Sequence, residues 1–281
     1  MPALPEVEVI RRDLEKEIVG RRIKDVEIRP GTNAMKIIRR HGRRKEFQDL
    51  LVGSKVQKID RVGRRLLLEL DSDRVLVFDL ADSASLLKTS SSDEVASHTH
   101  IVIAFTIGGQ LRVVDPRRAG EVFVVPRDEL EAVAGLRGYE MDPLDSPIAW
   151  PRFSALLEEH EVPVRELLLD GSFIVGLGEI YTDEILFTAG IRHDRPSNKL
   201  GSQDVRRLYR ALMETLQDAV KARGTTLGEQ GFRDLQGQPG TYQLELKVYE
   251  RDGEACRRCR NTVVKAAVNG GFTYFCPQCQ S

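Results

Sequence analysis

The chain has 281 residues, of which 41% are hydrophobic and 30% are charged. This length supplies two domains or one large one, with ample apolar material for cores. The net charge of −1 lacks the basic excess that a dedicated nucleic-acid binder usually carries. No apolar run of about eighteen residues occurs, so no membrane span is expected. The N-terminus lacks the apolar segment of a signal peptide, which predicts a cytoplasmic protein.

The first half of the chain predicts one helix followed by a β-sandwich. The helix ends before Gly20, and its apolar residues recur at helical spacing: Val7, Ile10, Leu14 and Ile18. Short, β-branched and partly alternating stretches then predict strands: Arg22–Ile28, Lys55–Val62, Arg65–Leu70, Arg74–Leu80, Thr99–Ile107, Leu111–Val114 and Glu121–Val125. Such a series is typical of a sandwich. The serine-rich segment Lys88–Ala96 is expected to be a mobile loop.

The second half of the chain predicts helices. They are expected at Phe153–Glu159, Pro163–Leu169, Ile180–Ala189 and Gln203–Arg223. An apolar stripe on the last of these favours a core-facing side. Gly224–Tyr242 holds five glycines and one proline, which predicts a long loop of the kind that is often functional.

All four cysteines lie in the last twenty-six residues, as two Cys-x-x-Cys pairs sixteen residues apart: Cys256 and Cys259, then Cys276 and Cys279. This spacing is a zinc signature, and four thiolates satisfy a tetrahedral Zn²⁺ at about 2.3 Å each. Two disulfides are the alternative, but nothing else in the chain indicates secretion. Two short strands around Asn269–Gly271 predict a hairpin between the pairs. We therefore expect one structural zinc ion.

These patterns predict an α+β protein. A leading helix and β-sandwich form a domain at residues 1–138, followed by a linker at 139–150. A helical domain at 151–243 precedes the zinc hairpin at 244–281.

This order of elements resembles the formamidopyrimidine-DNA glycosylase / endonuclease VIII family, essentially from end to end. The resemblance rests on four stretches besides the cysteines: Met1–Leu14, Asp115–Gly120, Leu167–Ile191 and Pro239–Tyr249. It implies that the sandwich is the catalytic-type domain and that residues 151–243 hold a helix-two-turns-helix DNA-binding element. It also implies a monomeric base-excision repair protein, associated with the nucleoid, that binds damaged or abasic duplex DNA and flips out the lesion.

The resemblance implies a covalent mechanism through Pro2. Once Met1 is removed, the family's N-terminal proline amine attacks C1′ of the damaged nucleotide and forms an iminium, and elimination then nicks the strand. An α-amino group has a pKa of about 8, so it is neutral at pH 7 more often than a lysine. Considered alone, Pro2 would be a proline without a role; the family pattern favours the nucleophile.

Two residues depart from the family's catalytic pattern. Ala3 stands where the family has the glutamate that is its main acid/base, and a methyl group moves no proton. Glu6 matches a second family carboxylate and is the retained candidate for proton transfer. Arg64 replaces a lysine that contacts phosphate and assists elimination; it keeps the charge but is a poor proton donor.

The implied DNA contacts are partly kept. Arg117, Arg118 and Tyr181 match family positions at the DNA, with Arg117 at the orphan base. Other positions are changed: Asp79 for histidine, Asp82 for methionine, Ala119 for phenylalanine, Glu179 for asparagine and Gly271 for the arginine of the hairpin tip. Each lost phosphate contact removes affinity and salt dependence, so weakened DNA binding is expected.

The retained and changed residues support two hypotheses about the function. One is a divergent DNA glycosylase/AP lyase with impaired or altered activity. The other is a non-catalytic, zinc-containing module that binds nucleic acid or protein. Two smaller candidates stand apart from these: the basic run Arg39–Lys45, either a solvated face or a contact to nucleic-acid backbone, and the pair His98 and His100, for which a surface pair is favoured over a metal site.

Overall fold

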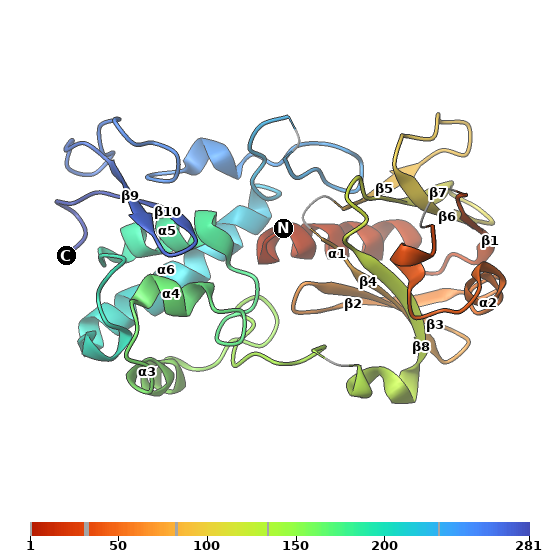
Figure 1. Cartoon of the computed structure of the whole chain (residues 1–281), viewed down its shortest axis with the longest axis horizontal. Helices are drawn as coiled ribbons and strands as arrows, with labels where there is room; N and C mark the ends of the chain where they lie inside the picture. The colour runs from red at the N-terminus through yellow and green to blue at the C-terminus, as the bar shows by residue number, and fades with distance from the viewer. Residues whose placement is uncertain (1, 31–33, 82–83, 134, 230) are drawn as a thin grey trace. The chain divides into compact units, whose positions relative to one another are not determined.

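The computed structural model describes residues 2–30, 34–81, 84–133, 135–229 and 231–281, and the chain divides into two compact units (Figure 1). Unit 1 comprises Met1–Arg137 together with Arg223–Gly240. Unit 2 comprises Gly138–Ala222 together with Thr241–Ser281. Within the described ranges, no helix has the length and apolar character needed to cross a membrane.

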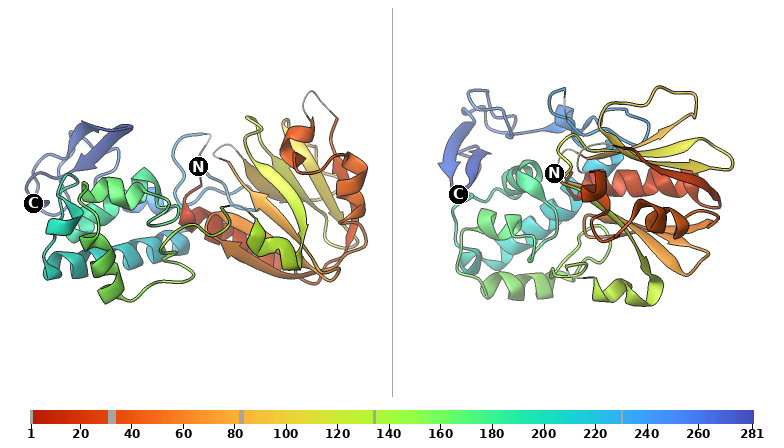
Figure 2. Two further views of the ribbon diagram at one scale, coloured as in Figure 1. Left: turned by 60° about the horizontal axis from the view of Figure 1, so that its bottom comes forward. Right: turned by 45° about the vertical axis from the view of Figure 1, so that its right-hand side comes forward.

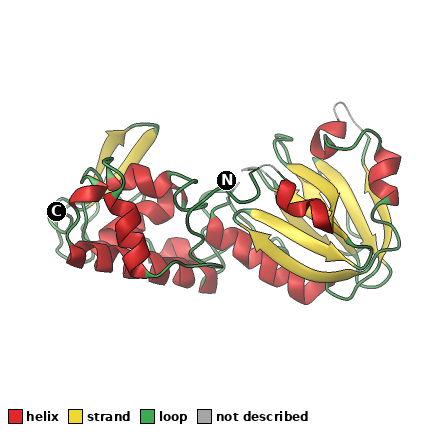
Figure 3. Cartoon of the chain, turned by 90° about the horizontal axis from the view of Figure 1, so that it is seen from below, coloured by secondary structure: helices red, strands yellow, loops and turns green. Residues whose placement is uncertain are grey.

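Unit 1 contains two four-stranded antiparallel sheets. The sheets face each other as a sandwich (Figure 2 and Figure 3). One sheet has the order β1-β6-β7-β5: Ile23–Ile28, Thr99–Phe105, Gln110–Val114 and Ser85–Thr89. The other has the order β2-β3-β4-β8: Val56–Val62, Arg65–Leu70, Arg74–Asp79 and Glu121–Pro126. All seven predicted strands are confirmed, and none of their ends shifts by more than two residues.

Strand β5 is the one that the sequence did not predict. The expectation of a continuous loop at Lys88–Ala96 is wrong at its start, because Lys88 and Thr89 pair with β7. Buried Arg112 of β7 holds the residues that follow. Its guanidinium donates to the carbonyl oxygens of Ser90, Asp93 and Glu94 at 3.3, 2.9 and 2.7 Å. The serine-rich composition of Lys88–Ala96 did not reveal that buried Arg112 supports this segment.

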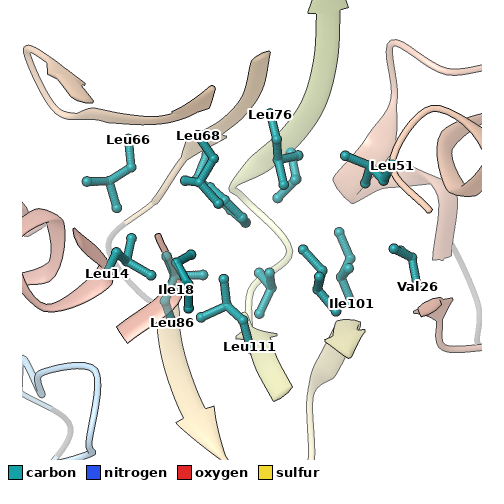
Figure 4. Close-up of a cluster of buried hydrophobic side chains, with 14 of the residues drawn as sticks. Leu14, Ile18, Val26, Leu51, Leu66, Leu68, Leu76, Leu86, Ile101 and Leu111 are labelled. Atoms are coloured by element: carbon teal, nitrogen blue, oxygen red, sulfur yellow. The ribbon is translucent and has the colours of Figure 1, made fainter. Parts of the chain in front are cut away.

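Helix α1, Leu4–Ile18, packs against the sandwich and shares its core. Leu14 and Ile18 of α1 lie among the leucines of the strands, and Leu51 and Val26 close the far side (Figure 4). Three short helical segments cover the edges: η1 (Ala34–Ile38), α2 (Arg44–Asp49) and η2 (Arg127–Ala132). Because α1 is fixed along its length by this core, the position of its N-terminal end is fixed with it.

Unit 2 is built from helices and one hairpin. Its helices are α3 (Trp150–Glu158), α4 (Val164–Leu169), α5 (Gly178–Ala189) and α6 (Ser202–Lys221), with the short η3 (Ser197–Lys199) and η4 (Tyr242–Glu245). The four predicted helices are confirmed, and the apolar stripe of α6 is buried as expected. The hairpin consists of β9 (Val264–Val268) and β10 (Gly271–Phe275), joined through Asn269 and Gly270.

Much of the basic run Arg39–Lys45 is engaged inside unit 1. Arg39 and Arg40 both pair with the buried carboxylate of Glu121, at 3.0 and 3.2 Å. The Arg40 guanidinium also lies 3.9 Å from the centroid of the Phe123 ring. His41 is buried, and its Nε2 accepts a hydrogen bond from the backbone N–H of Val124 at 3.0 Å. This part of the run therefore holds η1 against β8.

The stability of unit 1 is expected to fall as the solution is acidified from about pH 7.5 to about pH 5.5. Burial lowers the pKa of His41 below its ordinary 6.5, and nearby Glu46 offsets only part of that effect. In this range the unfolded chain takes up a proton that the folded chain rejects, so acid favours unfolding. Urea unfolding at several pH values should show this slope, and His41→Gln should flatten it. A slope that His41→Gln leaves unchanged would contradict the prediction.

Candidate functional site

The N-terminal end of α1 brings Pro2, Ala3 and Glu6 together. Partly exposed Pro2 precedes Ala3, the N-cap residue, which makes no side-chain cap. Glu6, in the first turn, is buried, and its Oε1 accepts the backbone N–H of Thr225 at 2.8 Å. The retained carboxylate therefore lies one helical turn from the predicted nucleophile and is oriented by the glycine-rich loop.

Gly224 is required for this arrangement. Its φ of +83° is in the left-handed region, and a Cβ there would lie 3.0 Å from both Cγ and Oε1 of Glu6. A side chain at this position would push Glu6 away from Thr225. The glycine content of the segment predicted a loop, as the structure shows, but it did not reveal that the loop contacts Glu6.

The same loop is anchored to α1 a second time, through residues that the sequence reading missed. Arg223 donates to Asp13 at 2.5 and 3.2 Å and to Asp234 at 2.6 and 3.0 Å. Both carboxylates are buried. Asp13 lies seven residues after Glu6, on the same face of the helix. The other oxygen of Asp234 accepts the N–H groups of Gln236 and Gln238, so one cation joins the helix to both ends of the loop.

Replacing Arg223 by methionine should loosen the loop. The change leaves two buried carboxylates without their cation, and we expect a loss of about 1–3 kcal/mol in unfolding free energy. The lower end is favoured because the Arg223 side chain is 43% exposed. Urea unfolding and limited proteolysis between 223 and 240 would measure the effect. Arg233→Met, an exposed change in the same loop, is the control; equal destabilisation by the two variants would refute the anchoring role.

Arg64 lies at the turn between β2 and β3. The turn has two residues, Gly63 and Arg64, with Gly63 at a φ of +56°. Arg61 fixes it, because its guanidinium donates to the Gly63 carbonyl at 2.7 Å and to Glu8 of α1 at 3.2 Å. The turn that carries Arg64 is thereby tied to the first half of α1, which also carries Glu6.

Glu8 is held as a carboxylate in this arrangement. Burial tends to raise its pKa, but the guanidinium groups of Arg11, Arg12 and Arg61 outweigh burial and lower the pKa below its ordinary value. Arg11 and Arg12 donate to it at 3.0 and 2.7 Å. Because all three partners are cations, Glu8 acts as a structural anion rather than as a proton donor.

Arg117 and Arg118 lie in a turn that Asp115 organises. The buried Asp115 carboxylate accepts the backbone N–H of Arg117 at 3.2 Å and that of Gly120 at 2.9 Å. Arg118 has a left-handed φ of +51°. Arg117 and Ala119 are exposed. The turn thus presents the Arg117 guanidinium to solvent on a fixed backbone.

Asp79 has a partner. Its carboxylate accepts a hydrogen bond from Arg65 at 2.9 Å, across the register in which these two residues face each other on β4 and β3. Its charge is therefore offset locally, and it repels a nearby phosphate less than an isolated carboxylate would. Asp82, which replaces the family's methionine, lies outside the described residues.

The four cysteines of unit 2 converge on one point, with their Sγ atoms all within 4.8 Å of one another. Sγ–Sγ distances of 3.4 and 3.9 Å separate Cys259 from Cys276 and Cys256 from Cys279. A tetrahedral zinc with Zn–S bonds of about 2.3 Å needs sulfur atoms about 3.8 Å apart, whereas a disulfide needs about 2 Å. The set fits one structural Zn²⁺, as predicted from the spacing, and the disulfide alternative is excluded.

Buried Asp183 of α5 and Arg165 of α4 fix the hairpin next to the helices. Arg165 donates to Asp183 at 2.9 Å and to the carbonyl of Phe272 at 2.8 Å. Asp183 also accepts the Thr273 hydroxyl at 2.8 Å and the Tyr274 N–H at 2.9 Å. Strand β10 is therefore held in register against α5 by a buried ion pair that also bonds to the strand.

This docking brings two of the changed family positions side by side. A Cβ built on Gly271 would lie 3.0 Å from Oε1 of Glu179. Glu179 is half exposed, and its Oε1 is 3.8 Å from the guanidinium of Arg165. Gly271 stands where the family has the arginine of the hairpin tip. Its neighbour is therefore Glu179, the carboxylate that replaces the family's asparagine.

Tyr181 lies in the interior of unit 2. Its ring is buried, and its centroid is 5.6 Å from that of Tyr242. Burial favours a packing role for the ring, and direct contact with DNA stays a prediction. His100 is also buried, with Nε2 2.8 Å from the carbonyl oxygen of Asp115. Among the described residues, only the cysteine set has the geometry of a metal site.

Comparison with known proteins agrees with the fold and with the four-cysteine zinc site. Three family models match successive parts of the chain: the formamidopyrimidine-DNA glycosylase N-terminal domain at residues 1–122, its H2TH domain at 140–230, and the zinc finger found in FPG and IleRS at 253–281. The chain is therefore of the class that joins a glycosylase-type N-terminal domain to a helix-two-turns-helix domain and a zinc finger.

Individual proteins narrow this class. The formamidopyrimidine-DNA glycosylase of Pelotomaculum thermopropionicum is 35% identical over 280 residues, covering 100% of this chain and 99% of that one. The crystal structure of MutM (Fpg) from Thermus thermophilus is 35% identical with a TM-score of 0.85, covering 99% and 98%. Lactococcus lactis Fpg in complex with DNA containing an abasic site is 29% identical with a TM-score of 0.88, covering 99% of each chain. The chain belongs to the formamidopyrimidine-DNA glycosylase family.

Proposed function

We propose that the protein binds duplex DNA at damaged or abasic sites and acts as a DNA glycosylase/AP lyase through the amine of Pro2, with base excision impaired or altered. The observation that carries this proposal is the N-terminal end of α1. There Pro2 precedes the helix, and the carboxylate of Glu6 is buried one turn away and held by Thr225. Family membership supports the same reaction class.

The proposed reaction starts with the neutral secondary amine of Pro2. At a damaged nucleotide its nitrogen bonds to C1′ as the bond between C1′ and the base breaks, and the amine proton passes to the departing base; the bond between C1′ and O4′ then opens and O4′ takes up a proton. At an abasic site the amine adds to the aldehyde carbon of the ring-opened sugar, and the aldehyde oxygen leaves as water. The product is an iminium ion, which lowers the barrier to loss of a C2′ proton and departure of the 3′ phosphate. Glu6 is the retained group for moving protons at the sugar, and Arg64 and Arg117 are proposed to hold the DNA.

Base excision and strand cleavage at an abasic site differ in how much they depend on a proton donor. Departure of a base needs a proton donor, and Ala3 supplies none. An abasic site has already lost its base, so the lyase step depends less on that donor. We therefore propose that cleavage at abasic sites is retained better than excision of a damaged base.

A non-catalytic binding module is the second candidate. Two separate changes favour it: Ala3 in place of the family's glutamate, and Glu179 beside Gly271 in the zinc-finger unit. These positions lie in the two parts that would act on the sugar and on phosphate. A protein that kept only the scaffold would bind abasic duplex DNA without cutting it. The proposed action on DNA fits a cytoplasmic, nucleoid-associated monomer.

Strand nicking at an abasic site separates the candidates. The assay uses a labelled duplex with one abasic site at low salt, alongside a band shift on a non-cleavable abasic analogue. We expect nicking by the wild-type chain and none by Pro2→Gly, with similar band shifts for both. Binding without nicking would overturn the lyase and support the module. Mass analysis of the intact N-terminus is the companion measurement, because a retained Met1 blocks the amine.

A further inference from the structure

An open cleft of about 530 Å³ lies on unit 1 at the C-terminal end of α1. It is lined by the last turns of α1 and by the segments that enter β1 and β2, together with Thr106 and Ile107 after β6. Helix α1 has 15 residues and therefore separates the cleft from Pro2 by roughly 22 Å. The cleft is distinct from the N-terminal site described above.

The charge of the cleft is strongly positive in a chain whose net charge is −1. Its lining contains four cations, Lys16, Arg21, Arg22 and Lys55, against one carboxylate, Glu17. Lys16 and Lys55 are exposed, and among the described residues neither ammonium has an ion-pair partner. Glu17 has Lys88 at 3.6 Å, so its charge is partly offset.

The two arginines stiffen the walls. Arg21 donates to the carbonyl oxygens of Glu17, at the end of α1, and of Ile107, the latter at 2.8 Å. Arg22 donates to the carbonyl of Gly53 and has Asp71 at 3.7 Å. Part of each guanidinium is therefore fixed by a backbone carbonyl, while its charge stays in the cleft.

The cleft is also where unit 1 exposes apolar surface. Within the described residues, the exposed large apolar side chains of unit 1 are Ile107 at 77%, Val52 at 44% and Val19 at 40%. Val19 and Ile107 line the cleft, and Val52 is next to Gly53, which accepts the bond from Arg22. The cleft therefore offers exposed aliphatic side chains beside its cations.

We propose that this cleft is a docking site for an acidic peptide segment of a partner protein that carries an aliphatic or aromatic side chain among its carboxylates. Lys16 and Lys55 bind the carboxylates, and Ile107, with Val19 beside it, contacts the apolar side chain. The combination distinguishes this partner from nucleic acid. A phosphate backbone would use the cations but would leave Ile107 and Val19 in water, whereas an acidic segment with an apolar side chain would use both.

The test is fluorescence anisotropy with a labelled peptide of four aspartates followed by leucine and phenylalanine. The full-length protein should bind it, and affinity should fall as salt rises. Lys16→Glu combined with Lys55→Glu should weaken binding by about tenfold or more, since two exposed ion pairs are reversed. Ile107→Asp should weaken it as well, and serine in place of the peptide's leucine and phenylalanine should have a similar effect.

The matched control is Lys24→Glu combined with Lys36→Glu, two exposed lysines of unit 1 that are outside the cleft. These variants should bind the peptide like the wild type, and unchanged thermal melting of all variants shows that folding is kept. Absence of peptide binding would overturn the proposal, as would equal loss in the control. A cleft variant that loses duplex-DNA affinity instead of peptide affinity would assign the surface to nucleic acid and also refute it.

Discussion

Replacing Ala3 by glutamate is expected to raise the rate of damaged-base excision by about 10² to 10⁴-fold, the usual contribution of a positioned general acid. Ala3 is the N-cap residue of α1, and its backbone carbonyl accepts the N–H of Val7 at 3.2 Å. A side chain there starts from a backbone that the helix already fixes. It would add a carboxyl group beside Pro2, whereas Glu6 is bonded to the loop.

The measurement is single-turnover excision from a duplex with one 8-oxoguanine. Ala3→Gln is the control, because it has the same shape and cannot transfer the proton. Cleavage of an abasic site should change much less than excision, since no base has to leave. If Ala3→Glu excises no faster than Ala3→Gln, the missing carboxylate is not what limits this chain.

Exchanging Glu179 for asparagine together with Gly271 for arginine is expected to tighten binding of abasic duplex DNA by about 100-fold. Two charge-assisted contacts to phosphate are worth roughly 1.5 kcal/mol each or more. The structure predicts that the two changes depend on each other. An arginine at residue 271 alone would lie against Oε1 of Glu179 and would form an ion pair there, so it would gain little affinity.

A double-mutant cycle measured by band shift tests this dependence. The gain from Gly271→Arg should be several-fold larger in the Glu179→Asn background than in the wild type. The salt dependence of binding should also steepen in the double variant. Gln278→Arg adds the same charge at an exposed position of the zinc finger and is the control. Equal gains in both backgrounds would contradict the prediction, because Glu179 would then not interfere with phosphate binding by an arginine at residue 271.

Local patterns were enough to predict much of the fold. Alternation of β-branched residues gave seven of the strands, and the spacing of the cysteines gave the zinc site, because both depend on residues close together in the chain. Strand β5 was missed because its paired residues run into a serine-rich segment whose support comes from Arg112, on another strand. A buried cation of this kind carries no periodicity signal.

For the candidate site, the sequence allowed residues to be proposed one by one but did not reveal how they are arranged. The family resemblance marked Pro2, Glu6 and the changed positions one by one. It gave no sign that Arg223 joins Asp13 to Asp234, because these three residues are distant in sequence. Nor did it show that Glu179 borders Gly271, or that Asp79 is paired with Arg65. These contacts change the expected effect of single substitutions, because the charge of each residue is offset or opposed by a neighbouring residue.

Borohydride trapping on a duplex with an abasic site tests the central claim most directly, because reduction turns the proposed iminium into a stable covalent bond. We predict a protein–DNA adduct with the wild-type chain, mapped by mass spectrometry to the peptide that begins at Pro2, and no adduct with Pro2→Gly. An adduct on a lysine, or an adduct that survives in Pro2→Gly, would contradict it. So would the absence of any adduct from a protein whose N-terminal Met1 has been removed and which shifts the same duplex.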